Sequence, residues 1–352
     1  WLKDVSARDF VWPRRTQSLN VAMGGQQSLQ EHACQSTCCS TDADTQIPLP
    51  SDTAVTVADM ATTFAGEQVV LRKDGDDEPK DRLMRTHENK YFNSDRDEFM
   101  FLAGKYLSDV QEERPLYTFS SGATYSGEWK GHQRHGFGVQ TWPDGVKYKG
   151  EWQHNRAEGK GCFLHADGDS YTGQWKQNKA EGKGVYVHQD SADYYGEWKN
   201  DFQNGYGCES WATGCKFQGF YKNGRKDGVG VYLWADGCEY HGEWIDNSVG
   251  GAGTYRGVDG RLFQGLWQDS FLNGYGQYCW EGGRMYRGQY GKDKKEGFGE
   301  FTWSDGRRYV GFWRQGKQHG HGRMHSSTGE IRHGTWTDGI RDKSLALKTT
   351  DG

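Results

Sequence analysis

From residue 125 onward, aromatic residues alternate with glycines and polar residues in a pattern that recurs every 23 residues. Each unit opens with an aromatic residue, carries a glycine two positions later and a second aromatic residue two positions after that. A Gly-x-Gly follows, from Gly136 and Gly138 to Gly320 and Gly322. Alternation with a period of two predicts β-strands with one apolar face. The lead positions are Tyr125, Tyr148, Tyr171, Tyr194, Phe217, Tyr240, Phe263, Tyr286 and Tyr309.

Each unit reads as a β-hairpin, and neighbouring hairpins join into a meander. Most units close with an Asp-Gly pair such as Asp144-Gly145, which favours a type I′ turn because both residues tolerate positive φ. Symmetric folding of the hairpin places every tryptophan between two glycines, so that the indole lies flat on the sheet. The predicted pairs are Tyr125 with Gln140, Gly127 with Gly138, Trp129 with Gly136 and, across the next turn, Gly138 with Trp152.

The expected fold is all-β, an elongated single-layer antiparallel meander of hairpins preceded by a short helical and disordered N-terminal region. We expect residues 1–93 to be mostly irregular or disordered, apart from a helix at 51–64, and residues 94–115 to form an amphipathic helix and linker. The array spans 116–340, and 341–352 is a tail. A truncated tenth unit begins at Arg332, where the lead aromatic residue is lost, as terminal repeats often show.

The helix before the array is predicted over 95–112, with Ser94 as its N-cap and Asp95, Asp97 and Glu98 in its first turn. Its apolar residues fall at helical spacing, and Pro115 ends it. An amphipathic helix needs an apolar partner, and the aromatic face of the first repeats is the nearest. The apolar positions are Phe99, Leu102, Ala103, Tyr106, Leu107 and Val110.

Composition and charge narrow the function classes. The chain has 51 glycines and only six prolines, which argues against helical bundles and collagen, and no apolar run is long enough to span a bilayer. Residues 125–352 hold 30 basic and 28 acidic groups, whereas residues 1–124 hold 13 and 20. Since the array has no basic stripe, nucleic acid is not expected as a partner. The cysteines form no CxxC pair, and their small number indicates a reduced, intracellular protein.

The motif YxGxW…GxGxxxxxDGxx at this period resembles the MORN (membrane occupation and recognition nexus) repeat over residues 116–340. The resemblance implies a curved single-layer sheet that acts as a non-enzymatic scaffold in a cytoskeletal or ciliary (axonemal) assembly, cytoplasmic and located at a cilium or the cell cortex. The partners it implies are other proteins of a large assembly, bound through helices or self-association. Two alternatives stay open: a membrane tether that binds acidic phospholipids, with membrane contact less favoured, and a regulatory module of a larger enzyme.

The candidate site is the aromatic face, because a single layer cannot cover its own rings and an apolar strip of this length needs a cover. That cover is the N-terminal helix, a second copy or a partner helix. A purely structural role for the rings is the competing interpretation. The predicted protein-binding residues are Tyr125, Trp129, Tyr148, Trp152, Tyr171, Trp175, Tyr194, Trp198, Tyr240 and Trp244.

Other candidate chemistry has a plainer explanation in each case, so no catalytic residue, metal or cofactor is expected. The segment 180–184 looks like a phosphate loop but lacks the rest of that motif. His319, His321 and His325 alternate along one strand, and His165 and His188 replace tryptophan as surface substitutions. Glu128, Glu151, Glu197 and Glu243 form a solvated face. Cys34, Cys38 and Cys39 are possible lipid-anchor sites in a polar segment. Since the chain begins at Trp1 and not at Met, organelle targeting is left open.

Overall fold

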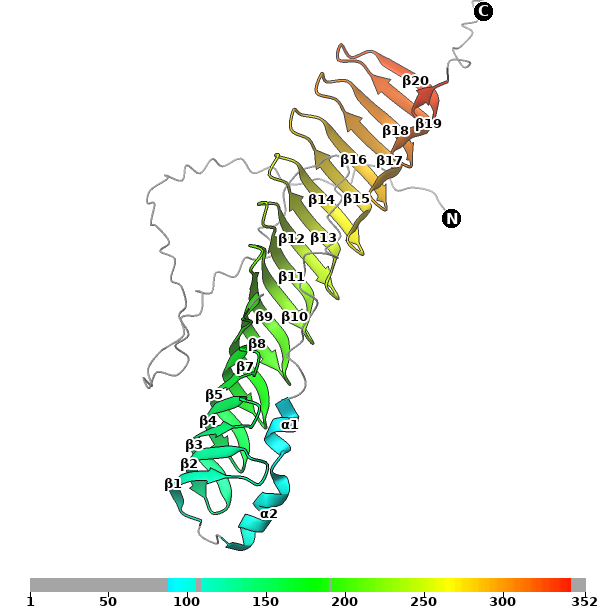
Figure 1. Ribbon diagram of the computed structural model, residues 1–352. Helices are drawn as coiled ribbons and strands as arrows, with labels where there is room; N and C mark the ends of the chain where they lie inside the picture. Colours follow the sequence, from blue (N-terminus) through cyan, green and yellow to red (C-terminus); the bar gives the residue numbers. More distant parts are fainter. Residues whose placement is uncertain (1–87, 106–108, 190–191, 343–352) are drawn as a thin grey trace, which may run out of the picture. The chain divides into compact units, whose positions relative to one another are not determined.

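The computed structural model describes residues 88–105, 109–189 and 192–342. Within these residues, one sheet of 21 strands is formed, and each strand pairs antiparallel with its neighbours in the chain (Figure 1). The predicted all-β, single-layer meander is confirmed. The helix predicted at 51–64 and the cysteines at 34, 38 and 39 lie outside the described residues.

Two kinds of strand alternate along the sheet. The strands that carry the lead position and the second aromatic residue are β2 (Thr124–Lys130), β4 (Lys147–Gln153), β6 (Ser170–Lys176), β8 (Ala192–Lys199), β10 (Lys216–Lys222), β12 (Glu239–Ile245), β14 (Leu262–Gln268), β16 (Met285–Gly291), β18 (Arg308–Arg314) and β20 (Ile331–Thr337). The others are β1 (Gln111–Thr118), β3 (Gln133–Thr141), β5 (Arg156–Leu164), β7 (Lys179–Val187), β9 (Phe202–Trp211), β11 (Arg225–Leu233), β13 (Ser248–Arg256), β15 (Phe271–Cys279), β17 (Lys294–Thr302), β19 (Lys317–His325) and β21 (Ile340–Arg341).

The Asp-Gly turns are not of type I′, which corrects the prediction. At Trp142–Gly145 only Gly145 has a positive φ, of 90°, and Gly145 N donates to Trp142 O at 3.0 Å. This is a type I turn followed by a glycine in the left-handed region. The paired positive φ values of type I′ turns occur at the opposite ends of the strands, for example at His154 (51°) and Asn155 (67°).

The tryptophan register also differs from the symmetric prediction. Tyr125 pairs with Gln140 and Gly127 with Gly138, as predicted, but Trp129 pairs with Arg134. The register shifts between Gly127 and Trp129 because a β-bulge lies opposite Glu128. Across the next strand Gly136 therefore meets Trp152, and Gly138 meets Gly150.

The ring that lies over the glycines is the lead tyrosine and not the tryptophan. A Cβ atom on Gly138 would lie 2.2 Å from Tyr125 Oη, and one on Gly161 would lie 2.4 Å from Tyr148 Oη. Each such hydroxyl donates to the backbone carbonyl three residues later, as Tyr148 does to Glu151 O at 3.0 Å. The tyrosine thus occupies the space that the missing side chains leave.

Successive repeats are joined at the type I′ turns. Asn155 N donates to Arg134 O at 3.1 Å, and Asn155 Oδ1 accepts a hydrogen bond from Arg134 N at 2.7 Å. Asn178 and Asp201 bind Ala157 and Ala180 of the preceding hairpin in the same two ways. Asn and Asp suit this position because they combine a positive φ with a side-chain acceptor, whereas Gly224, Gly316 and Gly339 make only the backbone bond.

The N-terminal helical segment consists of two short helices, α1 (Glu88–Asn93) and α2 (Arg96–Lys105). The single helix predicted over 95–112 is therefore too long, and α1 was not predicted. Residues 111–118 form β1, which pairs with β2 through a bulge that spans Pro115, so the array begins before residue 116. At the other end, β21 has only two residues and Arg332 is exposed, as a terminal unit predicts.

Substitution of Gly138 by alanine tests the packing of tyrosine on glycine. Gly138→Ala should lower the free energy of unfolding by about 1–3 kcal/mol, because the new methyl group overlaps the buried Tyr125 ring. In Gly104→Ala the methyl group meets no atom within 4 Å, so this variant should be neutral or slightly stabilising. Denaturant melts compare the two, and equal effects would contradict the packing described.

A second stability test concerns position along the array. Trp198 packs against Tyr171, Tyr186 and Tyr194. Trp198→Ala should therefore cost about 3 kcal/mol or more. Trp336→Ala should cost clearly less, because Trp336 lies in the terminal unit and packs on one ring, Tyr309, among the described residues. Similar losses in urea melts would contradict a nearest-neighbour array.

Candidate protein-binding face

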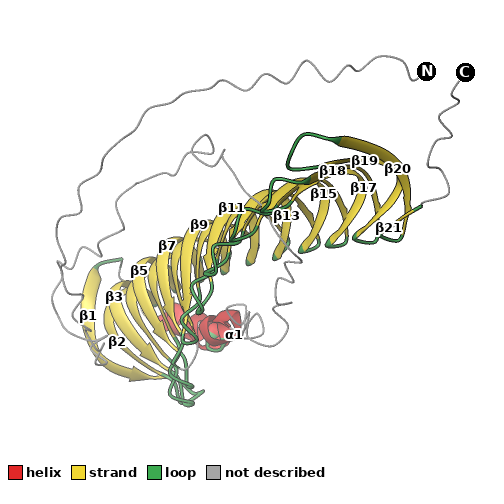
Figure 2. Ribbon diagram, turned by 90° about the horizontal axis from the view of Figure 1, so that it is seen from above, coloured by secondary structure: helices red, strands yellow, loops and turns green. Residues whose placement is uncertain are grey.

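The helices α1 and α2 lie against the aromatic side of the first repeats, inside the curve of the strands (Figure 2). Phe92 of α1 is buried, with 4% of its surface exposed. Its ring centroid lies 5.5–5.9 Å from five ring centroids of the sheet, those of Trp142, Tyr148, Trp152, Phe163 and Trp175. One helical side chain therefore fills a socket that spans three repeats.

Polar contacts position α1 over this socket. Tyr91 Oη donates to Asp144 Oδ2 at 2.8 Å, and Trp142 Nε1 donates to the carbonyl of Tyr91 at 3.0 Å. Burial, together with the Asp144 carboxylate, raises the pKa of the Tyr91 hydroxyl to about 12. The hydroxyl thus stays a donor at neutral pH.

Glu98 holds α2 at the start of the array. Its carboxylate accepts hydrogen bonds from Tyr117 Oη at 2.6 Å, from Ser120 N at 2.7 Å and from Ser120 Oγ at 2.8 Å. Burial opposes ionisation, but these three donors lower the pKa of Glu98 below its ordinary value of 4.5. Three donors to one carboxylate make this the most strongly bonded side chain of α2 among the described residues.

Arg134 is a buried cation on the aromatic face, and the sequence analysis missed it. Its guanidinium carbon lies 4.6 Å from the centroid of Phe99 in α2 and 4.1 Å from the nearest Trp152 ring. Burial lowers the pKa of Arg134 to about 9, and the nearby Asp95 carboxylate, at the start of α2, opposes that shift. The docked helices thus present both an aromatic ring and a carboxylate to a cation on the sheet.

The position of Arg134 recurs every 23 residues, and a cation also stands there in two later repeats and, as Arg341, in the truncated last unit. Lys226 Nζ lies 4.9 Å from the Trp211 centroid, and Lys295 Nζ lies 4.7 Å from that of Phe301. The equivalent residues in the second and third repeats are Ala157 and Ala180. The only sequence signal for the importance of this position was that its residue varies between small and large from one repeat to the next.

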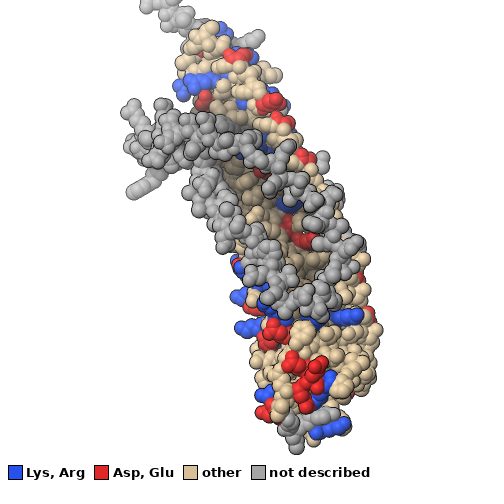
Figure 3. Space-filling view, turned by 90° about the vertical axis from the view of Figure 1, so that its left-hand side faces the viewer, with Lys and Arg blue, Asp and Glu red and all other residues tan. Residues whose placement is uncertain are grey.

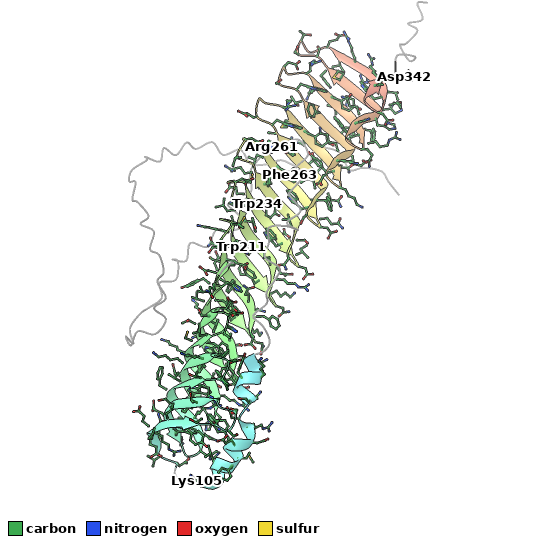
Figure 4. The ribbon with its side chains drawn as sticks, viewed as in Figure 1. Lys105, Trp211, Trp234, Arg261, Phe263 and Asp342 are labelled. Carbon is green, nitrogen blue, oxygen red and sulfur yellow. The ribbon has the colours of Figure 1, made fainter. Side chains whose placement is uncertain are left out.

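The aromatic face continues beyond the helices. Trp211 and Trp234, labelled in Figure 4, occupy equivalent places in successive repeats. The rings of Trp211 and Tyr232 are tilted against each other, with centroids 5.6 Å apart. Trp280 and Trp303 extend the same row, and Trp234 and Trp303 are only half-buried. Ring surface of the type that holds α1 therefore recurs in the later repeats.

Eight segments of the chain match the MORN repeat family, at residues 125–147, 148–170, 171–192, 194–216, 217–239, 263–283, 286–307 and 309–331. The chain belongs to the MORN repeat family. The intervening unit has the same geometry, because Tyr240 Oη donates to Glu243 O at 3.1 Å and Gly242 pairs with Gly253. The array thus has about nine MORN repeats, as predicted, and such repeats indicate a protein-interaction or membrane-associated scaffold.

The solved structures that are similar to this chain are only distantly so. A mutant TCP10 domain of Danio rerio CPAP is similar with 12% identity and a TM-score of 0.21, covering 56% of this chain and 99% of that one. The SAS-4 TCP domain of Drosophila melanogaster, in complex with a proline-rich motif of Ana2, has 11% identity and a TM-score of 0.16, covering 64% and 90%. These TM-scores are too low to support an argument. No curated protein matches the chain.

The ten predicted binding residues all lie on the aromatic face of the MORN array, and all are buried. Tyr148, Trp152 and Trp175 contact Phe92, so this chain's own helix already covers them. Partner binding through the ten rings stays a prediction. The structure adds Phe92, Arg134, Lys226 and the row of Trp211 and Trp234 as residues of this face.

The predictions for the histidines and glutamates of the MORN repeats were partly wrong. His165 and His188 are not surface substitutions, because their rings lie 4.8 Å from Phe163 and 4.5 Å from Tyr186. Glu128 faces away from the rings, as expected, but it is not merely solvated: its carboxylate accepts a hydrogen bond from Phe137 N at the bulge, at 2.8 Å. That bond lowers the pKa of Glu128.

The described residues contain no cluster of three potential metal ligands. His319 lies near Asp338, and His321 lies near Thr335. No described helix is long and apolar enough to cross a membrane.

Removal of the Glu98 charge tests the attachment of α2. The contribution of Glu98 to the attachment of α2 should be complete above pH 4.5. It should be lost as the pH falls through the lower pKa that Glu98 has in the folded protein, because only the ionised form makes all three hydrogen bonds. Glu98→Gln should show the released state already at neutral pH. NMR shifts of the α2 amides report this change, and Asp97→Asn on the same helix is the control. An unchanged Glu98→Gln spectrum would contradict the proposed attachment.

Proposed function

We propose that this MORN protein is a non-enzymatic scaffold whose aromatic face binds helices of other proteins. The observation that supports it is the seating of the chain's own α1 and α2, with Phe92 enclosed by five rings. The same ring surface recurs in the repeats beyond the helices. Burial of aromatic side chains dominates the energetics of such interfaces.

The contacts of α1 and α2 also indicate the chemistry of the partner. Phe92 fills an aromatic socket, and the Asp95 carboxylate has a favourable electrostatic interaction with the cation Arg134. Lys226 and Lys295 place positive charge at the equivalent positions of later repeats. These lysines are three repeats apart, about 29 Å along the sheet, which a helix of about 19 residues spans. The proposed partner is therefore an amphipathic helix with aromatic and acidic residues on one side.

The charge distribution favours a protein over a lipid surface. Acidic and basic side chains both occur along the length of the face shown in Figure 3, without a band of one sign. The lysines at 292, 294 and 295 do not act as one cluster, because Lys294 Nζ donates to Gln315 Oε1 at 2.8 Å and Lys295 packs on the rings. Attraction to anionic lipid requires several basic groups at one surface.

The proposed assembly and cellular location rest on the family resemblance alone. We place the scaffold in a cytoskeletal or ciliary assembly, in the cytoplasm, at a cilium or the cell cortex. The alternatives are a membrane tether and a regulatory module of a larger enzyme. The near-equal charge of residues 125–352 weighs against the first of these.

A labelled peptide of residues 88–105 is a suitable probe, since it has the aromatic and acidic residues that the face accepts. Added to the full chain, it should bind, and Lys226→Glu with Lys295→Glu should weaken binding at least tenfold, because acidic groups then meet like charge. Lys222→Glu, on an exposed position of β10, is the control for added negative charge, and thermal melts check that the change at the buried Lys226 leaves the fold intact. Fluorescence anisotropy measures all three. Equal affinity in the double variant would contradict the charge assignment, and no binding to any form would contradict the helix-binding face.

Vesicle binding distinguishes the membrane alternative. The full chain should not sediment with phosphatidylserine-containing vesicles at physiological salt. Strong sedimentation that is lost when Lys292 and Lys294 are changed to glutamine would instead favour the membrane tether.

A further inference from the structure

The side of the sheet opposite the aromatic face carries a second apolar feature, which we call the back stripe. It consists of six large side chains from repeats between β9 and β18, each of which is exposed over 40–56% of its surface. They lie at the middle x of Gly-x-Gly and at the position between the glycine and the second aromatic residue. The six residues are Tyr206, Phe220, Leu266, Tyr275, Phe298 and Phe312.

Within the back stripe the apolar pairs recur every two repeats, and Tyr275 lies between two of them, paired with Gln289. Tyr206 pairs with Phe220 across β9 and β10, and Phe298 pairs with Phe312 across β17 and β18. Midway between them, Ala252 pairs with Leu266. The rings of each aromatic pair are in contact, with centroids 5.5 Å and 5.6 Å apart. Successive pairs are four strands apart, which is about 19 Å.

The equivalent positions in the early repeats are polar except for Phe137, which is 50% exposed but pairs with the charged residue Glu151. There Lys160 pairs with Gln174 and Lys183 with Glu197. Gln174 accepts a hydrogen bond from Lys183 N at the bulge, at 2.9 Å, as Glu151 does from Lys160 N. Pairs in which both residues are apolar are thus confined to the later part of the array.

The apolar residues at the second of these positions give up a hydrogen bond that stabilises the other repeats. Phe220, Leu266 and Phe312 occupy the place of the bulge acceptor, lying beside Gly228, Gly274 and Gly320. A hydrocarbon side chain has no acceptor for the bulge N–H, and half of its surface is in water. Folding of the unit therefore favours Glu or Gln at all three positions, so the hydrophobic residues need another explanation.

We propose that the back stripe is the interface with a second copy of this chain. Two copies related by a two-fold axis bring each pair of one stripe onto a pair of the other, because both stripes have the same spacing. Six side chains, each about half exposed, contribute about 100 Å² each, or about 600 Å² per copy. The total of about 1,200 Å² is at the lower limit of a specific interface, where complexes are weak or transient. This inference uses the opposite face from the helix-binding proposal and does not depend on it.

Sedimentation velocity of the full chain from about 1 to 100 µM tests the proposal. Wild type should pass from monomer to dimer over this range. Phe220→Glu with Phe312→Glu should weaken dimerisation at least tenfold, because four carboxylates then enter the apolar interface. The double variant should fold normally, since the new carboxylates are the residue type that other repeats use to accept the bulge N–H.

Gln174→Glu is the matched control, because it makes the same type of change at the equivalent position of β6, outside the back stripe. Its dimerisation should equal that of wild type. Thermal melts of all three proteins should agree or show the double variant slightly more stable. The anisotropy probe for the aromatic face should bind the double variant unchanged, which separates failure of this inference from failure of the helix-binding proposal.

Three results would overturn the proposal. The first is a chain that stays monomeric at 100 µM, and the second is a dimer that survives in the double variant. The third is a monomer that sediments with phosphatidylserine vesicles through the same residues, which would assign the back stripe to a lipid surface.

Discussion

The contact of a tyrosine ring with a pair of glycines is the constraint on which the rest of this sheet depends. The ring lies where Cβ atoms on Gly138 or Gly161 would be, so both strands must carry glycine and neither can slip by one residue. The tyrosine hydroxyl then donates to its own strand, as Tyr148 does to Glu151 O. The tryptophan of the next repeat donates back to the same glycine strand, as Trp152 Nε1 does to Gly138 O at 3.2 Å. Each repeat is therefore completed by its successor.

The first and last repeats of such an array each lack one neighbour, and the two ends are closed in different ways. At its start, α1 and α2 supply rings and carboxylates that the sheet lacks there, through Phe92 and Glu98. At its end the lead tyrosine is replaced by Arg332, and Arg341 of β21 lies 5.9 Å from the Trp336 ring centroid while it donates to His333 O. The polar residue Arg341 thus covers part of the last tryptophan ring and does not itself form a new apolar edge. The N-terminal end, in contrast, is closed by the chain's own helices α1 and α2.

The repeat period and the phase of the rings could be predicted because a strand with one apolar face has a period of two. The register at Trp129 could not, because the bulge opposite Glu128 adds residues to one strand without changing the 23-residue period. The turn types were exchanged for a similar reason: Asp144-Gly145 fits both a type I turn with a following glycine and a type I′ turn, and only backbone geometry separates them. Phe92 and Arg134 were missed because their importance comes from contacts across separate elements. The helix that ends at Lys105 was extended too far because its apolar spacing continues to Val110.

The two sides of the sheet place different demands on sequence. On the aromatic face, the rings stabilise the fold in every repeat, so their presence alone says little about binding, and the informative residues are those that vary, such as Arg134, Lys226 and Lys295. On the other side, the regular residue is the acidic or amide acceptor of the bulge N–H, and hydrophobic replacements there lose a hydrogen bond and expose hydrocarbon to water. A residue that the fold does not require is a better indicator of an interface than one that it does. By this criterion Phe220 and Phe312, although they were assigned to no site from the sequence, are stronger evidence for an interface than the conspicuous tryptophans.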